Sequence, residues 1–113
     1  MFLIQAAILF NLKHRHVKAK PYTRVSDIVI AVNPYQWLTD LYQEKVRLFY
    51  AKKLVWEKSE KDPRMGLPPH IYEVSSLCYK GLAMDKQNQS ILVSGESGAG
   101  KTETVKILSL IHI

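Results

Sequence analysis

The octapeptide at residues 95–102 constrains the fold more strongly than any other part of this chain. Its sequence, Gly-Glu-Ser-Gly-Ala-Gly-Lys-Thr, fits the pattern G-x-x-x-x-G-K-[ST], in which a glycine-rich backbone wraps around phosphate groups. Glycine at positions 95, 98 and 100 permits sharp turns and puts no Cβ in the way of a phosphate. Successive backbone N–H groups can then point inward and form an anion-binding concavity. The sequence therefore predicts a phosphate-binding loop (P-loop).

The positions of this loop have distinct expected roles. The Lys101 ammonium is predicted to lie on the outer phosphates and to stabilise charge in the transition state, which makes it the candidate catalytic residue. The Thr102 hydroxyl is the candidate Mg²⁺ ligand. The candidate phosphate-binding residues are Gly95, Glu96, Ser97, Gly98, Ala99, Gly100, Lys101 and Thr102. A plain Gly/Ser-rich turn is the alternative interpretation.

The sequence on both sides of the loop supports the first interpretation. Residues 89–94 have the apolar, β-branched centre that is typical of a buried strand. Residues 101–108 contain no glycine or proline and carry several apolar side chains, which predicts a helix. The positive amino-terminal end of that helix would face the phosphates. A P-loop has this position between a strand and a helix.

The chain begins with an apolar stretch, residues 2–10, interrupted only by Gln5. Its apolar residues recur at helical spacing, which predicts a helix packed on a larger body; they include Leu3, Ala6, Ala7 and Phe10. The stretch is too short to span a bilayer, and basic residues follow it where a secretory signal has them in front. A signal anchor is the alternative.

A second strand is predicted at residues 25–32, where a continuous β-branched run is typical of a strand buried on both faces. Asn33-Pro34 ends it, because a residue before proline is pushed to extended geometry and proline cannot donate to a sheet. With residues 89–94, it predicts an α/β fold with helices around part of a central β-sheet. The edges of such a sheet stand open, so we expect a marginal or aggregating fragment.

Two helices are predicted between these strands. The first starts near Thr39 or Asp40 and runs to about Trp56, with apolar residues along one face. A loop with mixed charges follows over residues 58–68. The second helix starts after Pro68-Pro69 and ends by residue 85.

Composition sets further limits. The chain has 113 residues, enough for at most one ordinary domain, and its 47% hydrophobic content is typical of a globular protein. The net charge of +6 is concentrated in residues 13–24, where no aromatic stacking pattern accompanies the basic side chains. We expect a solvated face there and neither nucleic acid nor a membrane as partner. The single Cys78 cannot form an internal disulfide, which fits a reducing compartment.

Five motifs follow one another along the chain. They are ILFNL at 8–12 with Arg15, IAVNPY at 30–35, PHIY at 69–72, DKQNQS at 85–90 and GESGAGKTE at 95–103. In this order they resemble the early part of a myosin motor domain, and the resemblance covers residues 6–107. It implies that residues 1–113 are a partial motor domain, truncated at both ends and ending just after the P-loop.

The resemblance also implies roles that composition does not reveal. It implies a P-loop NTPase fold with ATP and Mg²⁺ as cofactors, and it places Asn33, Pro34 and Tyr42 beside the adenine. The basic residue that often follows Asn-Pro-Tyr in the family is Gln36 or Trp37 here. For the intact protein it implies an ATP-driven motor on actin filaments with a cytoplasmic, cytoskeletal location. The family's actin-binding surfaces are expected outside this chain.

Activity of this chain by itself is a separate question. In the family, catalysis also needs two switch loops that position the attacking water, and no such loops follow the P-loop here. We therefore expect negligible ATPase activity from the isolated chain, because phosphoryl transfer depends on positioning and electrostatics. A different P-loop enzyme and a non-catalytic interaction fragment with a basic face are the alternatives.

Two segments depart from the family pattern. Residues 52–66 look like an insertion before Pro68-Pro69. Residues 108–113, LSLIHI, are what CTG TCT CTT ATA CAC ATC encodes, which resembles a transposase adapter end used in sequencing libraries. We therefore expect a non-native tail, with a natural apolar helix end as the alternative.

Overall fold

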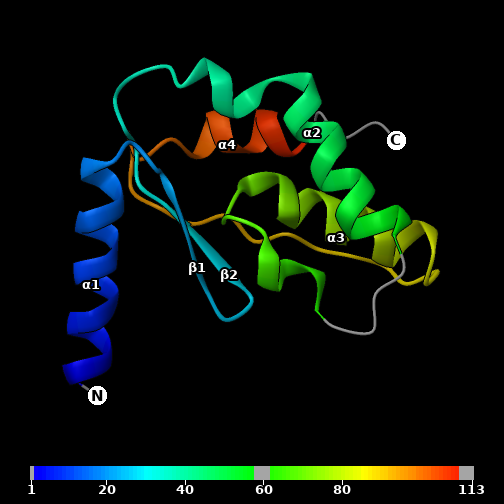
Figure 1. Cartoon of the computed structure of the whole chain (residues 1–113), viewed down its shortest axis with the longest axis horizontal. Helices are drawn as coiled ribbons and strands as arrows, with labels where there is room; N and C mark the ends of the chain where they lie inside the picture. The colour runs from blue at the N-terminus through cyan, green and yellow to red at the C-terminus, as the bar shows by residue number, and fades with distance from the viewer. Residues whose placement is uncertain (1, 58–61, 110–113) are drawn as a thin grey trace.

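The computed structural model describes residues 2–57 and 62–109. Figure 1 shows α1 projecting from one side, a β-hairpin beside it, and the other three α-helices gathered on the opposite side. Within the described residues, no helix is both long and apolar enough to cross a membrane. The elements in chain order are α1 (Phe2–Val17), β1 (Tyr22–Val25), β2 (Ile28–Ala31), a 3-10 turn (Thr39–Tyr42), α2 (Glu44–Ala51), a π-helical turn (Lys52–Trp56), a second 3-10 turn (Pro63–Gly66), α3 (Ile71–Ala83) and α4 (Lys101–Leu108).

The β-hairpin replaces the single strand predicted at residues 25–32. β1 and β2 pair antiparallel, with Tyr22 opposite Ala31. Ser26 reverses the chain between them in a left-handed conformation, with φ of +56°. β2 is not buried on both faces either, since Ile28 is 65% exposed. The prediction was wrong because a β-branched run does not reveal which of its residues form a turn.

The strand predicted at residues 89–94 is not formed, since this segment carries no regular secondary structure. Among the described strands, β2 pairs only with β1, so the segment has no ladder partner. A cavity of about 500 Å³ lies between the segment, β2, α3 and α4. A strand satisfies its backbone N–H and C=O groups only on a neighbour. The described sheet is therefore a two-stranded antiparallel hairpin, with helices around it.

The helices follow the sequence pattern more closely. α3 begins just after Pro68-Pro69 and ends at Ala83, as predicted. The helix expected from Thr39 or Asp40 begins only at Glu44, because the extended backbone of Gln43 separates α2 from the 3-10 turn before it. The π-helical turn continues α2 to Trp56, which confirms the predicted end. Residues 58–61 of the predicted loop lie outside the described residues.

The core lies between β1, α2 with its π-helical continuation, and α3. It consists of Tyr22, Tyr50, Leu54, Ile71 and Tyr72. Three of these five side chains are tyrosines, whose rings pack while their hydroxyls reach polar partners at the edge. The Tyr50 hydroxyl, for example, donates to the Pro68 carbonyl over 2.6 Å. The core therefore contains fixed hydrogen-bonding groups as well as apolar surface.

A buried ion pair joins the hairpin to α3. Arg24 Nη2 lies 2.8 Å from Glu73 Oε2, and the Glu73 side chain is 2% exposed. Arg24 also donates to the carbonyls of Arg64 and Leu67, so it connects three segments. Glu73 in turn accepts from the backbone N–H of His70, the residue that caps α3.

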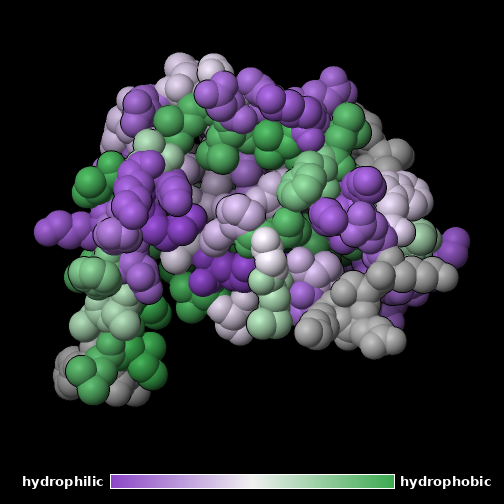
Figure 2. Space-filling view, viewed as in Figure 1, coloured by the Kyte–Doolittle hydropathy of each residue, from purple (hydrophilic) through white to green (hydrophobic). Residues whose placement is uncertain are grey.

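α1 is a helix as predicted, but it does not pack along its length on a larger body. Its carboxyl end is attached to β1, where Arg15 Nε donates to the Tyr22 carbonyl over 2.8 Å. Apolar side chains gather over its projecting end (Figure 2). The side chains expected to be covered, Leu3, Ala6, Ala7 and Phe10, are exposed.

Candidate functional site

The glycine-rich loop has the backbone that its sequence predicts. Gly98 and Gly100 have φ of +86° and +101°, a left-handed region that residues with a Cβ rarely adopt. Gly95 differs, since a Cβ there would make only ordinary van der Waals contacts, 3.4 Å from Cβ of Ala99 and 3.5 Å from Cγ of Lys101. The Lys101 side chain therefore lies against the loop. α4 begins at Lys101, which confirms the predicted helix after the loop.

The loop surrounds a concave space of about 400 Å³, which we call the loop hollow. It is lined by Glu96, Ser97, Gly98, Gly100, Lys101, Thr102 and Glu103. The side chains of Lys101 and Thr102 are exposed, and neither makes a hydrogen bond or ion pair with another described residue. Thr104 differs, since its hydroxyl donates to the Gly100 carbonyl over 2.8 Å. The polar ends of Lys101 and Thr102 can thus serve a ligand.

Thr102 fits the role of a Mg²⁺ ligand for the same reason. Its hydroxyl lines the loop hollow without a partner in the described part of the chain. Among the described residues, no group of three or more His, Cys, Asp or Glu side chains could hold a metal ion. Mg²⁺ in phosphate sites typically takes one or two protein oxygens and completes its shell with phosphate oxygens and water. One hydroxyl at this position suits that pattern.

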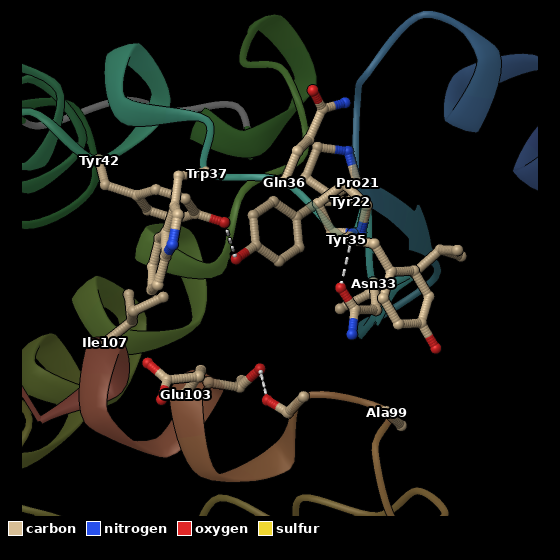
Figure 3. Close-up of a pocket in the computed structure, with 15 residues that line it drawn as sticks. Pro21, Tyr22, Asn33, Tyr35, Gln36, Trp37, Tyr42, Ala99, Glu103 and Ile107 are labelled. Atoms are coloured by element: carbon tan, nitrogen blue, oxygen red, sulfur yellow. Dashed lines mark hydrogen bonds between the residues drawn. The ribbon is translucent and has the colours of Figure 1, made fainter.

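A second space adjoins the loop hollow and is lined by aromatic side chains. This aromatic cavity has a volume of about 320 Å³ and lies between the loop after β2 and the start of α4 (Figure 3). Asn33, Pro34 and Tyr42, which lie far from the glycine-rich loop in sequence, all line it. Gly100 and Glu103 line both the aromatic cavity and the loop hollow. The two spaces therefore share lining residues at the first turn of α4.

Asn33 holds the two walls of the aromatic cavity together. Its Nδ2 donates to the Gly98 carbonyl over 3.2 Å, across 65 positions of sequence. Its Oδ1 accepts from the backbone N–H of Tyr35 over 2.8 Å, which supports the left-handed conformation of Tyr35. One amide side chain thus fixes the loop after β2 and attaches it to the glycine-rich loop.

Tyr42 lines the cavity as a half-buried residue at the end of its 3-10 turn. Its hydroxyl lies 2.8 Å from the Tyr22 hydroxyl (Figure 3). Its backbone carbonyl accepts from the Tyr72 hydroxyl over 3.3 Å. Burial raises the pKa of Tyr22 and of Tyr42 above the ordinary value of 10, so both hydroxyls keep their protons at neutral pH.

Several residues that line the cavity were not identified as site residues from the sequence. They include Tyr22, Trp37, Glu103 and Ile107. Glu103 and Ile107 lie one and two turns along α4, so helical spacing from Gly100 could have suggested them. Tyr22 and Trp37 reach the cavity through the hairpin and the loop after it, and no local pattern indicates that. Trp37 is 81% exposed.

Comparison with known proteins finds several myosin heavy chains that are similar to this chain. Myosin heavy chain 95F of Drosophila melanogaster is 42% identical over 108 residues, which cover 96% of this chain and 8% of the relative. Myosin-J heavy chain of Dictyostelium discoideum is 43% identical over 106 residues, covering 94% and 4%. Myosin IC heavy chain of the same organism is 39% identical over 99 residues, covering 88% and 8%.

These relatives are much longer than the chain, which spans 4% to 8% of their length. The family comparison covers nearly every residue, since residues 1–112 match the family described as myosin head (motor domain). This agrees with the resemblance carried by the five sequence motifs. The chain therefore belongs to the myosin head (motor domain) family.

Proposed function

We propose that this chain supplies the phosphate-binding and adenine-binding walls of the ATP site of an actin-based motor. The observation that carries the proposal is that the aromatic cavity and the loop hollow share Gly100 and Glu103 as lining residues. A nucleotide has a flat, mostly apolar base at one end and a chain of anions at the other. The two adjoining spaces offer matching surroundings in that order.

The loop hollow suits the phosphates. Loop N–H groups and the amino-terminal end of α4 favour anions, and α4 has eight residues beginning at Lys101. The Lys101 ammonium adds a full positive charge and would neutralise charge on the outer phosphate during transfer. The Thr102 hydroxyl would hold Mg²⁺, which supplies further charge neutralisation when it is bound.

The aromatic cavity suits the base. Asn33 and Pro34 line it beside the P-loop, and Tyr42 lines it with the hydroxyl bonded to Tyr22. Aromatic and proline side chains offer flat apolar surfaces. Besides its bonds to Gly98 and Tyr35, the Asn33 amide keeps a second N–H and a second oxygen lone pair for the base. The proposal therefore assigns Asn33, Pro34 and Tyr42 to the adenine.

Hydrolysis and movement belong to the longer protein under this proposal. Myosin head membership removes a kinase or GTPase as the preferred alternative. Water activation requires groups beyond the P-loop, so turnover by this chain alone should be negligible. Actin filaments are the proposed partner of the intact motor, and the cytoplasmic cytoskeleton is its proposed location.

Calorimetric titration of the chain with MgATP tests the proposal. Lys101→Ala should weaken binding about 10- to 100-fold, because a charge-assisted hydrogen bond to phosphate contributes about 1.5–3 kcal/mol. Lys18→Ala is the matched control, since it removes the same charge from an exposed residue of the basic stretch outside both spaces. Equal, salt-dependent binding by the Lys101→Ala variant and the parent chain would instead indicate an interaction fragment with a basic face.

A further inference from the structure

His70 lies where the amino-terminal end of α3 meets the turn that carries Tyr42. It is 1% exposed and stacks on Tyr72, with ring centroids 4.3 Å apart and planes inclined by 18°. The Tyr42 ring stands edge-on to it at 5.7 Å and 75°. His70 does not line the aromatic cavity itself. Any influence of His70 on the cavity therefore passes through Tyr42 and the residues beside it.

The hydrogen bonds of His70 fix the position of its proton. The backbone N–H of Tyr72 lies 3.0 Å from Nδ1, and an amide N–H can only donate, so Nδ1 is an unprotonated acceptor. In the neutral ring the proton is then on Nε2, which donates to the Leu41 carbonyl over 2.8 Å. Burial lowers the pKa of His70 to about 4, so the ring is neutral near pH 7.

These two bonds have different consequences. The bond to Nδ1 caps α3, whereas the bond from Nε2 fixes the carbonyl of the residue directly before Tyr42. Tyr72, on which His70 stacks, holds the Tyr42 carbonyl with its hydroxyl. The backbone on both sides of the Tyr42 Cα atom is thus attached to the first turn of α3.

We propose that His70 is a positioning residue for the adenine end of the nucleotide site. Its Nε2–H holds the Leu41 carbonyl and thereby sets the position from which Tyr42 lines the aromatic cavity. The inference rests on the proposed function, because it requires the base to occupy that cavity. It makes α3, which contributes no residue to the wall of the aromatic cavity, part of the selection of the base.

Two substitutions of His70 separate its two bonds. Asparagine is a good helix cap and keeps an acceptor near the Nδ1 position, but it is too short to reach the Leu41 carbonyl. Glutamine places an amide N–H near the Nε2 position and can restore the donor. The ligands are ATP, which uses both spaces, and inorganic tripolyphosphate, which uses only the loop hollow.

We expect His70→Asn to weaken ATP binding about tenfold, the effect of one hydrogen bond worth about 1.4 kcal/mol, with tripolyphosphate affinity unchanged. His70→Gln should bind ATP nearly as the parent chain does. Two results would overturn the positioning role and leave the proposed function standing. One is that the His70→Asn variant binds ATP as tightly as the parent chain, and the other is that it loses affinity equally for ATP and tripolyphosphate. A parent chain that binds neither ligand would overturn both.

A measurement on the unaltered chain keeps the inference testable if the variants do not fold. Nitrogen-15 NMR of the imidazole should show His70 with its proton on Nε2 at pH 7. ATP should shift the His70 ring resonances, and tripolyphosphate should leave them in place. The same response to both ligands, or none to ATP, would overturn the positioning role.

Discussion

Gly98 provides a test of backbone conformation that is separate from side-chain space. Its φ is +86°, and no atom lies within 4 Å of a Cβ built on it. Gly98→Ala should therefore meet no clash and should act only by straining the left-handed backbone, at a cost of about 1–2 kcal/mol. The loop would relax away from its anion-binding shape, and tripolyphosphate affinity measured by calorimetry should fall about tenfold.

The matched control for this substitution is Gly66→Ala. Gly66 also has open space around it, but its φ lies outside the left-handed region. Its substitution should leave tripolyphosphate affinity unchanged. Equal effects of the two substitutions would show that the loop does not depend on the conformation of Gly98.

His70 should make the stability of the chain depend on pH. Its pKa is lowered by burial from 6.5 to about 4, so the unfolded chain binds more protons than the folded chain between these values. The free energy of unfolding should therefore fall as the pH drops from about 6.5 towards 4, by about 3 kcal/mol in total. The ionisable side chains close to His70 include Tyr22, Tyr42, Tyr50, Tyr72 and Glu73, and Glu73 in turn pairs with Arg24.

Urea denaturation at a series of pH values measures this dependence. The His70→Asn variant, which cannot take up that proton, should lose much less stability over the same range. Asp62 acts in a different window, because its bonds to Arg64 hold its pKa at about 2. The stability that ionised Asp62 contributes to the fold is lost only as the pH falls below about 3.8. Identical pH profiles for the parent chain and the His70→Asn variant would contradict the assignment.

At the scale of the secondary-structure elements, the ion pair of Arg24 and Glu73 joins the hairpin to α3. The Glu73 side chain is 2% exposed, and Arg24→Met removes the cation that pairs with its carboxylate. Breaking a buried pair in this way typically destabilises a protein by about 3–5 kcal/mol, because the remaining charge is not solvated. Chemical denaturation should show a loss of that size.

Lys53→Met is the corresponding control at an exposed pair. Lys53 and Glu57 lie 3.3 Å apart on the surface of the π-helical turn, with both side chains about 40% exposed. Such pairs contribute about 0.5 kcal/mol or less. Similar losses for the two substitutions would indicate that Arg24 contributes by packing alone.

The elements also differ in how well the sequence predicts them. The predicted helices, including the one after the P-loop, were found because a helix satisfies its hydrogen bonds within one segment. Residues 25–32 and 89–94 had the composition of strands, but strand formation depends on a partner that lies elsewhere in the sequence. The first segment forms a hairpin, and the second has no described partner.

The candidate site follows the same division. The left-handed turns at Gly98 and Gly100 agree with the sequence pattern, because one continuous glycine-rich segment encodes them. Phosphate binding by residues 95–102 stays a prediction. Asn33, Pro34 and Tyr42 came from family resemblance alone, and the structure brings them into one cavity with Ala99 and Gly100 of the glycine-rich loop. Trp37 and the role of His70 depend on contacts between distant segments, which no local pattern encodes.

At the scale of the whole molecule, much apolar surface is exposed. The radius of gyration is 14.5 Å, compared with about 13 Å for a compact domain of similar length, and the projecting α1 contributes to the difference. Exposed apolar residues include Leu3, Ile4, Leu9, Phe10, Ile28, Leu92 and Met65. Such surface favours association over a stable monomer.

We therefore expect the isolated chain to melt over a broad temperature range and to aggregate as it does so. Calorimetry combined with near-ultraviolet circular dichroism measures both the breadth of the transition and the fixed packing of the tyrosines. A sharp two-state transition with native-like near-ultraviolet signals would contradict this expectation. Steady ATP turnover at a motor-like rate would contradict the expected absence of activity.

Predicted features of residues 110–113, including most of the expected tail, lie outside the described residues.

The aromatic cavity has one more consequence, which follows from where its walls come from. One wall consists of residues 21–42 and the other of residues 99–107, so any molecule bound between them joins two parts of the chain that unfolding would separate. The ligand then acts as a reversible cross-link. At 100 times its dissociation constant it would add about 2.7 kcal/mol to the stability of the fold. For a chain with so small a core, a nucleotide bound there as proposed would be a structural component of the fold.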